Sequence, residues 1–136
     1  HENFIIIDMG TATTFDIAIK DGEYVGSIIA PGANLAASAL HQCCSQLPSI
    51  EIYKPNLPVG NTTEDVMRSG LYYGYIGLMK EIVSRIKAQF TGIDFKIYLT
   101  GGLSTVFVQD LDFINGIETN LTIEGVNEVW HLNNKK

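Results

Sequence analysis

The stretch Phe4-Ile-Ile-Ile-Asp8-Met9-Gly10-Thr11-Ala12-Thr13-Thr14-Phe15-Asp16 is an apolar run that ends in an acid, a glycine and a group of threonines. Its four apolar residues, 4–7, are typical of a short buried strand. Asp8 comes directly after this strand, where a carboxylate is costly unless another group pairs with it. Gly10 permits a tight turn and a close approach between backbone and ligand. Residues 13–19 are β-prone and predict a second strand that returns from the turn.

This turn has the groups needed to bind an anion and a cation side by side. The hydroxyls of Thr11, Thr13 and Thr14, together with free backbone N–H groups, suit a polyanion. Asp8 can hold a cation beside that polyanion. A plain hairpin with polar turn residues would explain the same pattern without a ligand. The costly acid, and the clustering of glycine and threonines at one turn, favour the binding site.

Length and composition limit the class of protein. The 136 residues, of which 46% are hydrophobic, are enough for one folded domain with a core. A net charge of −6 without a basic run argues against nucleic acid or an anionic membrane as the main partner. The sequence has no signal peptide and no apolar run of membrane-spanning length. Cys43 and Cys44 are adjacent and have no second pair, which predicts reduced thiols in a cytoplasmic protein.

The remaining chain predicts one α/β domain. Lys20-Asp21-Gly22-Glu23 is a good hairpin turn between the second strand and a third. The first three strands therefore form an antiparallel meander, and we expect a mixed sheet flanked by helices. The predicted elements after the second strand are a strand over 24–30, a helix over 33–44, a short strand over 50–53, a long helix over 63–89, a strand over 95–99, a helix over 103–108 and a last helix that reaches Trp130.

The long helix contains three glycines near one face, Gly70, Gly74 and Gly77. Each of them costs about 1 kcal/mol relative to alanine in a helix interior. Close packing of another element inside the domain would explain them, and so would a subunit interface or contact with a nucleotide. The predicted buried stripe of this helix consists of Val66, Met67, Tyr73, Leu78, Ile82, Val83 and Ile86.

A second glycine turn follows the fourth strand. Thr100-Gly101-Gly102 lies between that strand and a helix-prone stretch. A strand, two glycines and a helix N-terminus form a place where a nucleotide can lie against the backbone. Taken alone, this pattern is a weak signal.

Together these motifs resemble the actin-like ATPase and sugar-kinase superfamily, whose members bind ATP between two related domains of ribonuclease H-like fold. Within it, the chain resembles the C-terminal half of a type III pantothenate kinase. The resemblance covers nearly the whole chain in the family's order and spacing. The matching stretches are residues 8–16, 26–32, 47–48, 60–63, 69–70, 73–74, 100–103 and 121–125.

The resemblance implies phosphorylation of pantothenate by ATP to 4′-phosphopantothenate, the first step of coenzyme A biosynthesis. It implies that Asp8 holds a monovalent cation, potassium or ammonium, and that Mg²⁺ accompanies the ATP. Thr63 matches the threonine that contacts pantothenate, although Thr62-Thr63 stands where the family usually has Asn-Thr. The implied ATP-binding residues are Gly10, Thr11, Gly101 and Gly102.

The resemblance further implies that residues 1–136 are a single domain, the C-terminal half of a two-domain kinase that forms a homodimer. The family's Asp-x-Gly-Asn-Thr phosphate motif is not in this sequence, nor is its Gly-x-Asp-Arg segment, which supplies the general base. We therefore expect the 136 residues alone to be inactive. Two alternatives remain open: another small-molecule kinase of the superfamily, and a non-catalytic accessory or regulatory relative. The upstream reading frame distinguishes them, because intact copies of both motifs would favour catalysis.

Overall fold

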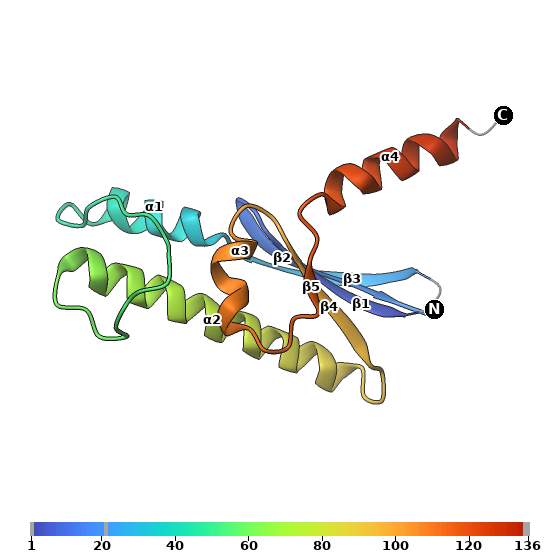
Figure 1. The fold of residues 1–136 in the computed structure, drawn as a ribbon, viewed down its shortest axis with the longest axis horizontal. Coiled ribbons are helices and arrows are strands. Elements are labelled where there is room, and N and C mark those ends of the chain that lie inside the picture. The colour runs from blue at the N-terminus through green and yellow to red at the C-terminus, as the bar shows by residue number, and fades with distance from the viewer. Residues whose placement is uncertain (1, 21, 135–136) are drawn as a thin grey trace.

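The structure is a computed structural model that describes residues 2–20 and 22–134. Figure 1 shows a twisted sheet with a long helix lying across one of its faces. The elements in chain order are β1 (Asn3–Met9), β2 (Ala12–Ile19), β3 (Glu23–Pro31), α1 (Ala33–Cys43), α2 (Thr63–Gln89), β4 (Phe95–Thr100), α3 (Ser104–Phe107), a 3₁₀ turn (Val108–Asp110), β5 (Gly116–Ile117) and α4 (Leu121–Asn133).

The five strands form one mixed sheet in the order β3-β2-β1-β4-β5. β1, β2 and β3 pair antiparallel, which confirms the predicted meander. β4 pairs parallel with β1, and β5 pairs parallel with β4. The parallel neighbours β1 and β4 need a long crossover between them, and the connection from β3 to β4, which contains α1 and α2, supplies it. In the predicted hairpin turn, Asp21 lies outside the described residues, and Lys20 and Gly22 have positive φ angles of 26° and 84°.

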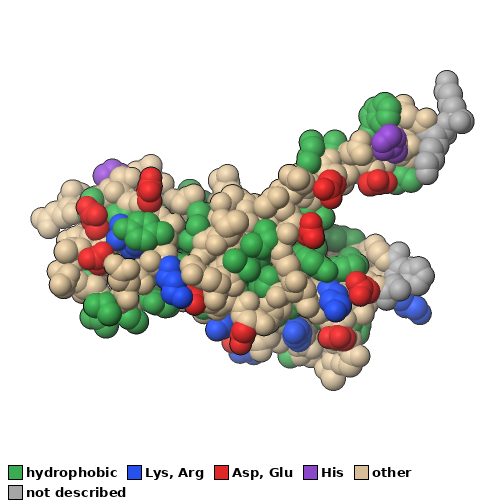
Figure 2. Space-filling view, viewed as in Figure 1, with side chains coloured by type: hydrophobic (Ala, Val, Ile, Leu, Met, Phe, Trp, Pro, Cys, Tyr) green, Lys and Arg blue, Asp and Glu red, His purple; other side chains and the backbone are tan. Residues whose placement is uncertain are grey.

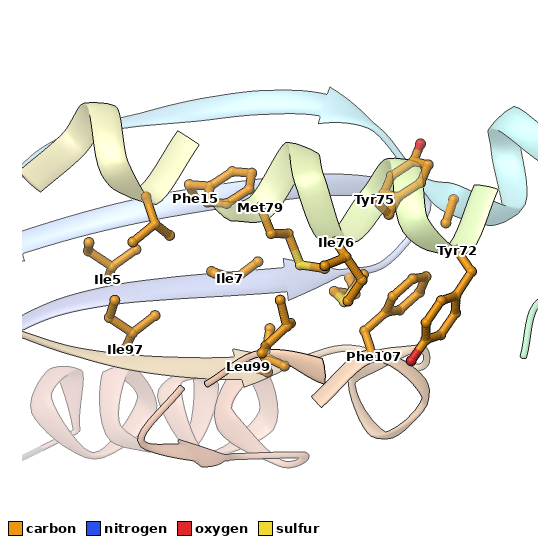
Figure 3. Close-up of a cluster of buried hydrophobic side chains, with 14 of the residues drawn as sticks. Ile5, Ile7, Phe15, Tyr72, Tyr75, Ile76, Met79, Ile97, Leu99 and Phe107 are labelled. Carbon is orange, nitrogen blue, oxygen red and sulfur yellow. The ribbon is translucent and has the colours of Figure 1, made fainter. Parts of the chain in front are cut away.

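The core lies between this sheet and α2 (Figure 3). Alternate residues of β1, namely Ile5, Ile7 and Met9, are buried against the helix, as the two-residue period of a strand requires. Phe15 of β2 and Leu99 of β4 extend the same apolar layer. The intervening residues of β1 point to the other face of the sheet and are half-buried. Asp8 belongs to that second face.

The buried side of α2 is rotated from the predicted stripe. Met67, Val83 and Ile86 are buried as predicted, but Val66 is 57% and Tyr73 37% exposed. The core positions of the helix are taken instead by residues that include Tyr72, Tyr75, Ile76 and Met79. Two of these are tyrosines, whose hydroxyls find acceptors at the edge of the core. The Tyr75 hydroxyl donates to the Pro31 carbonyl at 2.7 Å.

The three glycines of α2 lie on the exposed side of the helix. A Cβ atom added at Gly70, Gly74 or Gly77 would meet no other described atom within 4 Å. Close packing inside this domain is therefore the wrong explanation of these glycines. A subunit interface or a ligand contact remains as the explanation.

The segment between α1 and α2 contains no strand, so the short strand predicted over 50–53 is wrong. Ile52 is buried there, which explains the apolar pattern. The Glu51 carbonyl accepts a hydrogen bond from the Arg68 side chain of α2 rather than from a neighbouring strand. The two-residue strand β5 was not predicted, because so short a segment carries no periodicity.

The last helix, α4, stands clear of the sheet and of α2 (Figures 1 and 2). Its side chains Ile123, Val126 and Trp130 are all exposed. Within the described part of the chain, nothing covers this apolar face.

A polar cluster joins the segment before α2, α2 itself and the 3₁₀ turn. Asp110 accepts from the Lys54 ammonium at 2.7 Å and from the Tyr72 hydroxyl at 2.8 Å. These two donors hold the pKa of the Asp110 carboxyl below its usual range. Burial, followed by the hydrogen bond to Asp110, raises the pKa of the Tyr72 hydroxyl well above its usual value.

We expect the free energy of unfolding to fall less steeply in acid for Asp110→Asn than for the unchanged protein. A carboxyl whose pKa is lowered by folding stabilises the protein above its ordinary pKa of about 3.9, and this contribution is lost as the pH falls from there through the lowered pKa of the folded state. Unfolding by denaturant at several pH values measures the effect. Lys54→Met removes the ammonium and should weaken the same pH dependence. An unchanged slope in both variants would contradict this account of Asp110.

Candidate functional site

The two predicted glycine turns meet at one edge of the sheet. β1 and β4 are parallel neighbours, so their carboxyl ends lie side by side, and ligands of open α/β sheets bind outside such ends. Asp8 is opposite Thr100 of β4 and Thr14 of β2 in the strand register. The acid therefore lies between the turn that follows β1 and the turn that follows β4.

Gly101 allows the second turn to pack directly against Asp8. Its φ angle is +88°, and a Cβ atom built there would lie 2.5 Å from Oδ1 of Asp8 and 2.6 Å from the carbonyl carbon of Met9. A Cβ atom at Gly10 would lie 3.5 Å from the same Oδ1. The structure thus brings together Asp8, Gly10 and Gly101, three residues that the sequence predicted separately.

A groove of about 440 Å³ opens at these turns. Three of the predicted ATP-binding residues, Gly10, Thr11 and Gly102, lie on its wall. Sequence reasoning missed its third wall, which Asn34, Leu35 and Ser38 of α1 form. Gly101 and Asp8 are not part of the lining.

The start of α1 reaches the groove because Gly32 packs on the first turn. The Gly32 N–H donates to the Thr11 carbonyl at 3.1 Å, and a Cβ atom at Gly32 would overlap the carbonyl oxygens of Gly10 and Thr11. No side chain caps α1, so its first N–H groups are free to bind a ligand. The helix dipole makes this end attractive to negative charge. The Pro31-Gly32 pair was the signal in the sequence that could have located this wall.

The donor set suits a phosphate chain with a hard cation. Thr11 and Ser38 bring hydroxyls to the groove, the start of α1 adds free backbone N–H groups, and Asp8 places a carboxylate oxygen beside the Gly10 and Gly101 turns. Oxygen ligands of this kind suit potassium, ammonium or magnesium. The described residues contain no cluster of three or more His, Cys, Asp and Glu side chains that could hold a metal ion alone. Asp8 can therefore contribute one ligand of such a cation and not a complete site.

Thr63 lies apart from this groove. It is the exposed first residue of α2 and lines neither the groove nor its turns. The preceding residue, Thr62, caps the helix by accepting from the Asp65 N–H. A separate pocket of about 220 Å³ borders the same turn, and Gly60, Asn61 and Arg68 are among its lining residues. The predicted cation and phosphate positions are thus together, and the predicted substrate position is elsewhere in this chain.

Of the threonines in the first turn, only Thr11 faces the groove. The Thr14 hydroxyl donates to the Asp16 carboxylate at 3.0 Å. Thr13 points into the core, fully buried, and its hydroxyl has no hydrogen-bond partner among the described residues. The sequence could not separate these roles, because alternation along β2 decides them.

We expect Thr13→Val to raise the free energy of unfolding by about 1 kcal/mol, because it removes a buried, unsatisfied hydroxyl without changing the side chain's shape. Thr14→Val is the matched comparison and should lower it, since it removes a hydrogen bond. Urea unfolding of both variants measures the difference. A loss of stability in Thr13→Val would show that the hydroxyl is satisfied after all.

Three further features bear on the class of protein. Cys43 and Cys44 are both free thiols on the surface. Across residues 2–20 and 22–134, no helix combines the length and apolar character required to cross a membrane. On the face shown in Figure 2, Lys and Arg side chains are interspersed with acidic ones and form no basic patch.

Comparison with known proteins gives a consistent result. A family model described as "Type III pantothenate kinase" matches residues 1–85. The type III pantothenate kinase of Ruegeria sp. (strain TM1040) is 44% identical over 98% of this chain and 50% of its own length. That of Acidiphilium cryptum is 46% identical over 90% of this chain and 46% of its own length. The chain therefore spans about half the length of the curated relatives it matches.

A solved structure matches the fold. A crystal structure described as a conserved putative Baf family transcriptional activator from Campylobacter jejuni superimposes with a TM-score of 0.66. The match covers 97% of this chain and 59% of the other, at 21% sequence identity. At that identity the likeness concerns the fold alone.

Proposed function

Because this chain belongs to the type III pantothenate kinase family, we propose that the full-length protein transfers the γ-phosphoryl group of ATP to the hydroxyl of pantothenate. The product is 4′-phosphopantothenate, so the reaction is the first step of coenzyme A biosynthesis. The observation that carries the proposal is the 44–46% identity to kinases of this name across nearly the whole chain.

The groove between the two glycine turns is the proposed phosphate site. Phosphoryl transfer requires mainly positioning and neutralisation of charge. Thr11 and the backbone of Gly10 and Gly102 would orient the phosphate chain, and the free N–H groups of α1 would add positive potential. Asp8 would hold a potassium or ammonium ion. Such a cation, together with Mg²⁺ on the ATP, supplies neutralisation of phosphate charge when bound.

We propose that residues 1–136 are one ribonuclease H-like domain, the C-terminal half of a two-domain kinase. The mixed sheet with its antiparallel meander, and the fold match at a TM-score of 0.66, support this assignment. The general base would then come from the other half. The two free surface thiols are in keeping with a reducing cytoplasm.

ATP consumption by the full-length protein tests the proposal. We expect turnover that requires pantothenate and is stimulated by potassium, and no turnover from residues 1–136 alone. A folded full-length protein that ignores pantothenate but accepts a sugar or another acid would replace the substrate and keep the kinase. Failure with every phosphoryl acceptor would leave the regulatory alternative.

We propose that the glycine face of α2 forms the interface of a homodimer. Its glycines are exposed and leave room for a second backbone to approach. Gly74→Leu should therefore convert the full-length dimer to monomers without unfolding it, as sedimentation or light scattering would reveal. Gln89→Leu, an exposed site at the C-terminal end of the same helix that lies about 100° around the axis from the glycine face, should leave the dimer intact. A Gly74→Leu protein that remains dimeric would place the interface elsewhere.

A further inference from the structure

Arg68 of α2 is a charged residue that no motif singled out. Its side chain is buried, with 6% of the residue exposed, and arginine is rarely buried without partners. The guanidinium donates to Oδ1 of Asp65 at 3.0 Å and to the Glu51 carbonyl at 3.2 Å. It also stacks 4.0 Å from the ring centroid of Tyr53. Arg68 therefore ties the segment before α2 to the first turns of that helix.

The Asp65 carboxylate connects Arg68 with the turn before the helix. Its Oδ1 accepts from Arg68, and its Oδ2 accepts from the Thr62 hydroxyl at 2.8 Å. The Asp65 N–H in turn donates to that hydroxyl at 3.2 Å. This reciprocal pair is a capping arrangement, and Arg68 holds the carboxylate in the orientation that it needs.

At its start, the same turn packs against the backbone of α2 through Gly60. A Cβ atom at Gly60 would lie 2.6 Å from the backbone carbon and Cβ of Asp65, so only glycine fits there. Residues 60–62 are thus fixed at Gly60 by packing and at Thr62 by the Asp65 carboxylate. Thr63, whose own side chain is exposed, directly follows Thr62, so the contacts of Gly60 and Thr62 with Asp65 fix its position.

We infer that Arg68 is a positioning residue for Thr63, acting through Asp65 and Thr62 to hold the turn that contacts the phosphoryl acceptor. The inference rests on the proposed function for the identity of that acceptor. Arg68 does not line the groove between the two glycine turns. It lines the separate pocket beside Gly60 and Asn61. A planar guanidinium is required, since a lysine ammonium cannot stack on Tyr53 while donating to both oxygens.

Kinetics of the full-length protein test this role. Arg68→Gln and Arg68→Lys should each raise the KM for pantothenate about tenfold while the KM for ATP and kcat stay within about twofold, because ground-state positioning of one substrate is lost. Arg85→Gln is the matched control. Arg85 lies on the same helix and pairs with Glu81 at 2.6 Å, but is exposed to solvent. That variant should leave all three constants unchanged.

A double-mutant comparison tests the route through Asp65. If Arg68 acts through this carboxylate, Arg68→Gln combined with Asp65→Asn raises the KM for pantothenate no more than the larger single change does. Additive effects would overturn the route, and an unchanged KM for pantothenate in both Arg68 variants would overturn the role. An equal rise in both KM values would identify a merely structural effect.

Hydrogen exchange provides a readout that does not depend on turnover. Arg68→Lys should speed amide exchange at Asn61, Thr62 and Thr63 and leave the amides around Arg85 unchanged. If wild-type protein shows no pantothenate-dependent turnover, the proposed function fails, but this local change still decides whether Arg68 holds the turn. Unchanged exchange at residues 61–63 would overturn the inference.

Discussion

Replacing Gly101 with alanine is expected to lower the free energy of unfolding by about 3–4 kcal/mol, the upper range for a single substitution. Two costs add at this position. An L-residue at a φ of +88° is strained, and the new Cβ would lie within 2.7 Å of the Met9 backbone and of the Asp8 carboxylate. The Met9 obstacle is backbone, which cannot turn away as the Asp8 side chain can, so the clash with Met9 and the strained φ carry the cost.

Gly102→Ala provides the matched control for Gly101→Ala. A Cβ atom at Gly102 would meet nothing within 4 Å, and its φ is not in the left-handed region. Its cost should therefore remain below about 1 kcal/mol. Equilibrium unfolding of the 136-residue chain measures both variants. Equal stability of the two would mean that the turn after β4 can move away from β1, and the described packing of Gly101 on Asp8 would be wrong.

The first four strands along the chain were predictable because each carries a local signal. The apolar run 4–7, the hairpin turn at 20–23 and the run 95–99 each define a strand without reference to the rest of the chain. The convergence of Asp8, Gly10 and Gly101 also follows, once β1 and β4 are parallel neighbours. The sheet brings the ends of neighbouring strands together however far apart they are in the sequence.

The features that the sequence did not predict depend on packing between distant segments. The buried face of α2 depends on Tyr72 and Tyr75, whose hydroxyls reach Asp110 and the Pro31 carbonyl. Their acceptors are more than thirty residues away along the chain, so no local window contains both partners. The α1 wall of the groove likewise depends on the contact between Gly32 and Thr11. The roles of individual site residues, Thr63 included, remain predictions.

On the proposed function, Asp8→Asn is expected to lower kcat of the full-length protein about a hundredfold and to abolish its stimulation by potassium, because a preorganised charge beside the proposed phosphate site is lost. Asparagine keeps the size of the side chain and one oxygen, so the change isolates the charge. Folding should not suffer, since the structure gives the half-buried Asp8 carboxylate no ion pair among the described residues that the variant would break. Steady-state rates over a potassium titration, with thermal unfolding alongside, measure both effects.

Asp16→Asn is the control that separates a site effect from a general loss of negative charge. Asp16 lies on β2, on the same face of the sheet as Asp8, and accepts from Thr14 and Tyr24 rather than facing the glycine turns. Its replacement should leave potassium stimulation intact. If Asp8→Asn kept full stimulation, the cation would bind elsewhere, and the turn of residues 8–11 would act on the phosphate through Thr11 and its backbone alone. If both variants lost stimulation equally, the cation would respond to the charge of this sheet face as a whole, and Asp8 would not be its ligand.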